Sequence, residues 1–266
     1  HLDFPDYGSE IDAVLERMKE GEVGAISIGT DLESSKRALK IAEENKNIWC
    51  CIGVHPIQEK GGLKDIERIE DKGFNEKGFE ELVKSASWRT KVVAIGECGL
   101  DWFRIPEEKM KEERVRQTAL FESQINFALK YDKPLMLHCR QSYDDVLDIL
   151  EVYKREQGEK LRGNSHFFAG NIEQEKRFLD IGFTLSFTGV ITFTNDYDEV
   201  IKFIPDGSIM SETDSPFVAP VPHRGKRNEP VFVKEVVARM AQIRGESEEE
   251  MAKKLLQNAR NLFSLA

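Results

Sequence analysis

The sequence has no long hydrophobic run and no surplus of basic residues. No segment reaches the roughly 18 consecutive apolar residues of a membrane-spanning helix, and the first residues lack the basic and apolar regions of a signal peptide. The net charge is −10 at pH 7. This balance argues against broad electrostatic coating of duplex nucleic acid, which requires a basic face. A local basic patch beside a metal ion can still bind one or two phosphates.

Cysteine is scarce, and its spacing is not that of a metal finger. The four cysteines are Cys50, Cys51, Cys98 and Cys139. All four lie inside apolar, strand-like runs, so we expect reduced and mostly buried thiols. Because such thiols persist in reducing compartments, we expect a cytoplasmic protein.

The length of 266 residues, 40% of them hydrophobic, is enough for one substantial core. It is close to the ~250 residues typical of a (β/α)8 barrel. No internal repeat, low-complexity tract or interdomain linker is evident, so we expect a single domain over residues 1–266.

Short apolar runs alternate with longer amphipathic segments, as in βα units built around a parallel sheet. The runs predict strands over residues 25–28, 48–54, 92–96, 134–137, 164–168, 183–187 and 208–211. The amphipathic segments predict helices over residues 11–20, 32–44, 74–85, 107–130, 143–157, 172–179 and 197–204, with two more at the end of the chain. A capping box at residues 247–250 opens the last helix. Residues 60–73 are polar and predict a loop with a short helix.

Seven strands are predicted, so one strand of an eight-stranded barrel is not accounted for. The chain opens on His1 with no apolar run before it. We therefore expect an α/β fold, a TIM-type (β/α)8 barrel whose first strand is truncated at its start and keeps only its C-terminal end.

Histidines and acids fall where the predicted strands end. These residues are His1, His55, Glu97, His138, His166 and Asp214. In a barrel the C-terminal ends of the strands converge on one face, where the active site lies. Imidazole and carboxylate groups that converge there would form a mixed nitrogen and oxygen site for divalent cations.

Some of these residues, and the nearby Asp101, also have an ordinary structural interpretation. His138 alone would be interpreted as a core histidine bonded to the backbone. His55 precedes Pro56 and could cap a turn, so a metal-ligand role and a structural role are about equally supported. We favour a role in supporting a metal ligand or in contacting the substrate. Asp101 is interpreted as a loop or helix cap. Glu97 follows the run VVAIG, and a carboxylate there is rarely buried without a partner.

The segment 211–230, SETDSPFVAPVPHRGKRNEP, places carboxylates beside cations. A basic run such as residues 223–227 is most often a solvated loop when taken alone. Three prolines before this run, Pro216, Pro220 and Pro222, fix the backbone of a rigid loop. Because the run lies close to Asp214, it favours attack on an anionic substrate such as a phosphate ester.

Five motifs in order form a recognisable set. They are IGVHP (52–56), AIGECGLDW (94–102), KPLMLHCR (133–140), HFFAGN (166–171) and the segment 211–230. Together with the opening HLDF, the set resembles the TatD family of metal-dependent deoxyribonucleases in the amidohydrolase superfamily. The resemblance spans almost the whole chain. It implies a TIM-type barrel that hydrolyses phosphodiester bonds in DNA, often as a 3′ to 5′ exonuclease on single strands.

The resemblance also implies the metal ligands, which are His1, Glu97, His138, His166 and Asp214, with Glu97 bridging two ions. The family's first histidine stands two residues before the position of His1 and is outside this sequence. The segment HFFAG departs from the family pattern at Phe167 and Ala169, which changes the wall of the pocket more than the chemistry.

The mechanistic hypothesis uses two divalent ions that generate hydroxide and stabilise the attacking and leaving oxygens. Asp214 would also orient or deprotonate the attacking water. His55, Arg140, Arg224 and Arg227 are the candidates for contacts to phosphate, because the planar arginine fork offers two donors at fixed spacing. Carboxylates and a phosphate substrate favour Mg²⁺ or Mn²⁺ in use, whereas the imidazoles would take up Zn²⁺ or Ni²⁺ in crystals. Glu212 has two candidate roles, to hold the loop or to bind a 3′ terminus, and we favour the structural role.

Two alternatives stay open. The first is a metal-dependent hydrolase of a small phosphoester, lactone or amide, because this barrel supports many chemistries. The second is a barrel with an inactive centre that binds nucleic acid or a partner. The basic HRGKR run favours an anionic substrate, and buried ligand-type residues without a cation would be costly.

Overall fold

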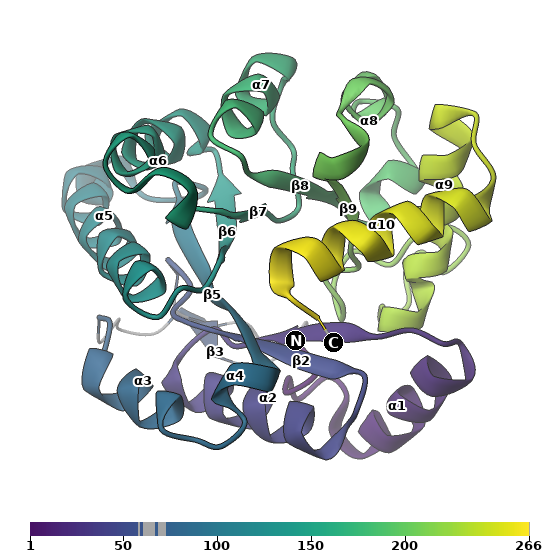
Figure 1. Ribbon diagram of the computed structural model, residues 1–266, viewed down its shortest axis with the longest axis horizontal. Coiled ribbons are helices and arrows are strands. Elements are labelled where there is room, and N and C mark those ends of the chain that lie inside the picture. Colours follow the sequence, from purple (N-terminus) through teal and green to yellow (C-terminus); the bar gives the residue numbers. More distant parts are fainter. Residues whose placement is uncertain (58, 61–66, 69–72, 266) are drawn as a thin grey trace.

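A parallel sheet of seven strands forms the centre of the molecule and curls upon itself, with helices on its outer face (Figure 1). The computed structural model describes residues 1–57, 59–60, 67–68 and 73–265. The strands lie in the order β1-β2-β5-β6-β7-β8-β9, and each pair of neighbours is parallel. Their bounds are β1 Ala25–Ile28, β2 Ile48–Ile52, β5 Val92–Asp101, β6 Leu135–Arg140, β7 Gly163–Ser165, β8 Thr184–Phe187 and β9 Ile209–Ser211.

The helices follow the strands in alternation, as expected for βα units. They are α1 Ile11–Glu20, α2 Leu32–Glu44, α3 Glu76–Val83, α4 Trp88–Lys91, α5 Glu107–Lys130, α6 Tyr143–Gln157, α7 Ile172–Asp180, α8 Asp198–Phe203, α9 Val233–Arg244 and α10 Glu248–Phe263. Short 3₁₀ turns occupy Gly8–Glu10, Gly158–Lys160, Gly189–Thr192, Asp206–Ser208 and Pro230–Phe232. No helix in the described part of the chain is long and apolar enough to cross a membrane.

The segment predicted as a loop with a short helix, residues 60–73, contains parts of a small antiparallel hairpin. Its strands are β3 (Glu59–Lys60) and β4 (Glu67–Arg68). The described residues 60, 67 and 68 therefore form strand where no strand was predicted. Most of the remaining segment lies outside the described residues, and the predicted short helix with it.

The predicted bounds of β1, α1, α2, α5 and α6 are those observed. Two strands run further than predicted, because β5 continues to Asp101 and β6 to Arg140. The apolar runs stop earlier, but Glu97, Asp101 and His138 beyond them are paired inside the barrel and the ladder continues. The prediction for β7 was too long. Phe167 has a positive φ of 46° and cannot continue a strand.

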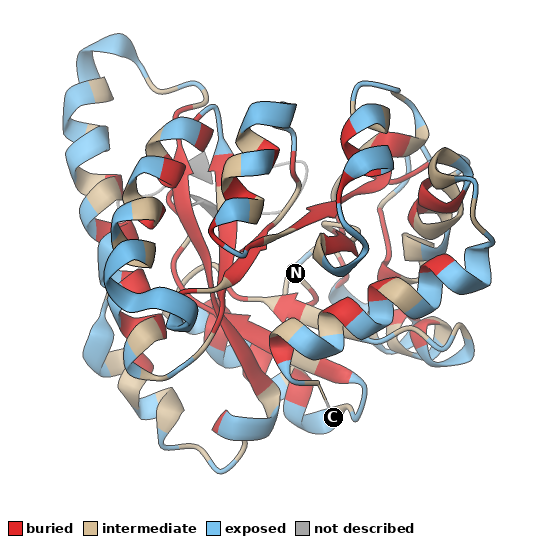
Figure 2. Cartoon of the chain, turned by 45° about the horizontal axis from the view of Figure 1, so that its top comes forward, coloured by how far each residue is buried: buried red, intermediate tan, exposed pale blue. Residues whose placement is uncertain are grey.

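Helix ends and the hydrophobic core follow directly from the sequence. Asp31 caps α2 by accepting from the amide of Ser34, and the predicted capping box of Ser247 and Glu250 is present at the start of α10. The strands are buried on both faces, whereas the helices expose their outer sides (Figure 2). The site residues are thereby mounted on a rigid inner sheet.

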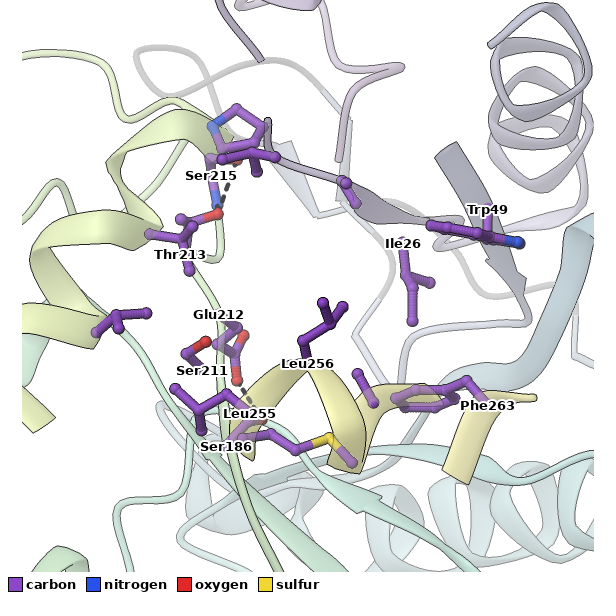
Figure 3. Close-up of a pocket in the computed structure, with 18 of the residues that line it drawn as sticks. Ile26, Trp49, Ser186, Ser211, Glu212, Thr213, Ser215, Leu255, Leu256 and Phe263 are labelled. Atoms are coloured by element: carbon purple, nitrogen blue, oxygen red, sulfur yellow. Dashed lines mark hydrogen bonds between the residues drawn. The ribbon is translucent and has the colours of Figure 1, made fainter. Parts of the chain in front are cut away.

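The curled sheet is not closed, because β1 and β9 do not pair with each other. A cavity of about 780 Å³ lies between these two edges. Ile26 and Trp49 line one wall, and Leu255 and Phe263 line the other (Figure 3). Seven parallel strands with this open side agree with the predicted barrel. His1 lies at the same cavity.

Candidate metal centre

Glu97 is at the centre of the polar cluster, and an irregularity in β5 positions it. The register with β6 shifts between Ile95 and Cys98, as in a β-bulge, which re-aims a side chain. The backbones approach closely here, since a Cβ on Gly96 would lie 2.3 Å from the carbonyl oxygen of Met136. Glycine is therefore required at this position. The carboxylate of Glu97 enters the barrel on a residue only 4% exposed.

One oxygen of Glu97 faces three imidazoles. Oε1 lies 2.8 Å from Nδ1 of His138 and 3.0 Å from Nε2 of His166. It lies 3.7 Å from Nε2 of His55. The structure thus brings His55 into the group of ligand-type residues, whereas its sequence position favoured a substrate or outer role. His55, Glu97 and His138 each offer a donor atom, and all three atoms lie within 4.8 Å of one another.

The other oxygen of Glu97 faces a second, smaller group. Oε2 lies 3.7 Å from Nε2 of His1, and that nitrogen lies 3.5 Å from Oδ1 of Asp214. Nδ1 of His1 lies 3.1 Å from the carbonyl oxygen of Ile28, and the ring stacks on Phe4. These contacts orient Nε2 of His1 toward the two carboxylates.

Two further carboxylates fix the orientation of the histidines. Oε2 of Glu212 lies 2.9 Å from Nδ1 of His166. Its Oε1 accepts from the amide of Phe167 at 2.7 Å. The same oxygen accepts from the hydroxyl of Ser186 at 2.5 Å (Figure 3). Glu212 therefore holds both the loop and the imidazole, an arrangement that sets the tautomer of metal-binding histidines.

Asp101 fixes the orientation of His138 in the same way. Its Oδ2 lies 3.0 Å from Nε2 of His138, and its Oδ1 accepts from the amide of Phe103 at 2.8 Å. The predicted cap is confirmed, but the contact with His138 was missed. The sequence carried no simple signal for it, because the irregularity around Glu97 interrupts the alternation of side chains along β5. The strand was predicted to end before Glu97.

The electrostatics of the cluster favour a cation. Burial opposes ionisation of Glu97, but His166, His138 and His55 outweigh it and hold the pKa of Glu97 well below its usual value. Burial and the neighbouring His138 lower the pKa of His55 to about 4. Burial alone would lower the pKa of His166, yet Glu212 and Glu97 raise it well above its usual value. The buried carboxylates thus require positive charge, from protons or from metal.

The donor set fits divalent metal ions. It combines imidazole nitrogens with carboxylate oxygens, which suits Mn²⁺, Zn²⁺ and other first-row ions. The two oxygens of Glu97 face two separate groups of donors, which is the arrangement that a bridging carboxylate needs. All five predicted ligands lie within this cluster.

The predicted phosphate-binding arginines separate into two kinds. Arg227 is engaged, because its Nη2 lies 2.6 Å from Glu10 and 3.3 Å from Glu229, and its Nη1 donates to the carbonyl of Asp6. It therefore holds a loop and does not face the cluster. Arg140, by contrast, is exposed at the end of β6, and Arg224 is exposed within the loop after β9.

The loop that carries Asp214 is held by Asn228, a residue that sequence reasoning did not single out. The buried amide of Asn228 donates to the carbonyls of Thr213 and Phe217, at 2.8 and 2.6 Å. Tyr7 donates its hydroxyl to the carbonyl of Asn228 at 3.1 Å. Asp214 has a positive φ of 51°, a conformation that Asp tolerates better than most residues.

Comparisons with known proteins agree with the geometry. The sequence model of the family described as "TatD related DNase" matches residues 1–264. An uncharacterized metal-dependent hydrolase of Bacillus subtilis, YabD, is 36% identical over all of this chain and 97% of its own length. The 3′-5′ ssDNA/RNA exonuclease TatD of Citrobacter koseri is 29% identical over 96% of this chain and 93% of its own. The crystal structure of the TatD homolog YjjV of Escherichia coli has a TM-score of 0.82 and 30% identity, over 100% of this chain and 96% of that one.

Proposed function

The chain belongs to the TatD-related DNase family of metal-dependent hydrolases, and from this membership and its site we propose that it hydrolyses phosphodiester bonds in single-stranded DNA, from the 3′ end. The observation that carries the proposal is the buried Glu97, whose two oxygens face two groups of imidazole and carboxylate donors. A relative named as a 3′-5′ exonuclease of single-stranded DNA and RNA supports the substrate and the direction of cleavage.

We assign His1 and Asp214 to one divalent ion and His138 and His166 to the other, with Glu97 shared. His55 is a further candidate beside the second ion, and contact with a phosphate oxygen is its alternative role. When bound, such ions lower the pKa of water and stabilise negative charge on the phosphodiester oxygens. We propose Mg²⁺ or Mn²⁺ as the ions in use.

The chain's own residues then orient the reactants. Asp214 accepts a proton from the attacking water, because its carboxylate lies beside His1 at the mouth of the barrel. Glu212 and Asp101 hold His166 and His138 in position. Arg140 and Arg224 contact the phosphates. We place the reaction in the cytoplasm, which suits the four free, buried cysteine thiols.

The test separates DNA from small substrates. Purified protein with Mn²⁺ is offered an end-labelled single strand, and in parallel small phosphoesters, lactones and amides. We expect a ladder of shortened strands that is lost in Asp214→Asn and Glu97→Ala. Turnover of a small ester without cleavage of any strand would assign the chain to the alternative chemistry.

A barrel that only binds nucleic acid is the other alternative. It predicts retention of the labelled strand without products at any metal concentration. Products from the wild-type protein that Asp214→Asn does not form would eliminate it.

A further inference from the structure

Two phenylalanine–arginine pairs stand on either side of the metal centre. The guanidinium of Arg140 lies 3.6 Å from the centroid of the Phe103 ring. The guanidinium of Arg224 lies 3.9 Å from the centroid of the Phe193 ring. Both distances are those of a guanidinium stacked on an aromatic face, where the contact is favourable.

Both pairs belong to the face of the barrel that carries the site. Phe103 follows β5 and Arg140 is the last residue of β6, each two residues beyond Asp101 or His138. The amide of Trp102 donates to the carbonyl of Arg140 at 2.9 Å, which ties the two strand ends together. The first pair is therefore fixed directly beside the centre.

The second pair lies on the loops that follow β8 and β9. The amide of Val221 donates to the hydroxyl of Thr192 at 2.9 Å, which joins the two loops, and Arg224 donates to the carbonyl of Ala219 at 3.2 Å. The loop after β9 is the one that carries Asp214. Since β6 and β7, with His138 and His166, lie between β5 and β8 in the sheet, the two pairs stand on opposite sides of these histidines.

The arginines of these pairs differ from most others in the chain. Many arginines are ion-paired, as Arg177 and Arg239 are. Within the described residues, neither Arg140 nor Arg224 forms an ion pair, although the chain has a net charge of −10. Phe193 is 42% exposed, which is unusual for a large aromatic residue. An exposed cation on an exposed aromatic ring, Arg224 on Phe193, thus remains on the loops beside the site. Phe103 is half-buried, and its ring also carries the guanidinium of Arg104, 4.7 Å from its centroid.

This combination matches the chemistry of an unpaired nucleotide chain. Bases stack on aromatic side chains only when they are not stacked within a duplex, and arginine contributes both a planar face and donors to the backbone phosphates. Stacking is tolerant of sequence, because every base has a π-face.

We propose that Phe193 stacks on a base of the substrate beside the scissile bond and thereby selects single strands. Arg224 and Arg140 hold the adjacent phosphates. The inference rests on the proposed nuclease function and adds the side chain that recognises a single strand by its unstacked bases.

The experiment compares two single strands of equal length. One is oligothymidylate, and the other carries abasic spacers in place of its nucleotides, so that the phosphates remain and the bases are absent. For Phe193→Leu we expect the ratio of kcat/KM on the thymidylate strand to kcat/KM on the abasic strand to fall by about 5- to 150-fold, because one stacked base contributes about 1–3 kcal/mol. The loss should lie mainly in KM.

Two control variants separate base stacking from other effects. Phe203→Leu alters a phenylalanine that is 70% exposed at the far end of α8, and should leave the ratio unchanged. Arg224→Gln should lower kcat/KM on both strands, because both carry phosphates. An unchanged ratio in Phe193→Leu, or a ratio that Phe203→Leu lowers equally, overturns the stacking inference. If the wild-type protein cleaves neither strand, the nuclease function itself fails, and the inference fails with it.

Discussion

Replacement of Glu212 by glutamine tests how the outer carboxylate prepares His166 for a metal ion. Oε1 of Glu212 accepts from the amide of Phe167 and the hydroxyl of Ser186, while Oε2 faces Nδ1 of His166 at 2.9 Å. A glutamine must keep its oxygen toward the Phe167 amide, because an NH₂ group there would oppose another donor. Its NH₂ group therefore faces Nδ1 of His166.

That exchange moves a proton on the ring. In the neutral ring that would bind a cation, Glu212 holds the proton on Nδ1 of His166, and Nε2, which lies 3.0 Å from Glu97, offers its lone pair. With glutamine, Nδ1 must accept, so the proton of the neutral ring moves to Nε2 and blocks the ligand position. Loss of such an outer partner weakens metal binding or activity by about 10- to 100-fold, which corresponds to about 1.4–2.7 kcal/mol.

The assay is a titration of metal-free protein with Mn²⁺, in which binding is measured by calorimetry or equilibrium dialysis. The value of kcat/KM is then measured at saturating Mn²⁺. Ser186→Ala is the matched control, because it removes one donor to Glu212 and leaves the contact with His166 in place. It should weaken Mn²⁺ binding much less. Wild-type affinity and activity in Glu212→Gln, in a protein with an unchanged unfolding temperature, would refute the reasoning.

Two other predictions concern stability. Asn228→Ala removes the amide that donates to two loop carbonyls, so the free energy of unfolding in urea should fall by about 1–3 kcal/mol; an equal loss in Asn261→Ala, on the exposed side of α10, would contradict a specific role. Burial of Glu229 raises its pKa, but hydrogen bonds from Arg17 and Arg227 outweigh burial and leave the pKa lowered. Its stabilisation is therefore complete above the unfolded pKa of about 4.3 and is lost as the pH falls through the lower folded pKa. Arg17→Met should be destabilised at pH 6, and its deficit should shrink as Glu229 becomes protonated; a deficit that does not change with pH would argue against the ion pair.

The sequence predicts much of the fold because the fold depends on periodic patterns. The apolar runs and amphipathic segments locate the seven strands and their helices, and the observed bounds of α5 are those predicted. The hairpin β3–β4 and the extension of β5 were missed. In β5 the strand continues beyond its apolar run because Glu97 and Asp101 find partners inside the barrel, and a sequence pattern does not contain those partners.

The convergence of the ligand-type residues was predicted in outline for a related reason. Strand ends converge, so the positions of His138, His166 and Asp214 predict a cluster before any distance is known. The roles of the supporting residues depend on contacts between distant segments. Asn228 is one polar residue among many until its amide meets two carbonyls of the same loop. Arg227 belongs to a basic run in the sequence, yet the fold turns it toward carboxylates of another segment.

The central claim is hydrolysis of a nucleic acid strand with divalent ions held at Glu97. Its most direct test is the release of mononucleotides from labelled single-stranded DNA by protein stripped exhaustively with a chelator, before and after addition of Mn²⁺. The account predicts no release from the stripped protein, and recovery with Mn²⁺ in the wild type but not in Glu97→Ala. Release by the stripped wild-type protein at an undiminished rate would contradict it.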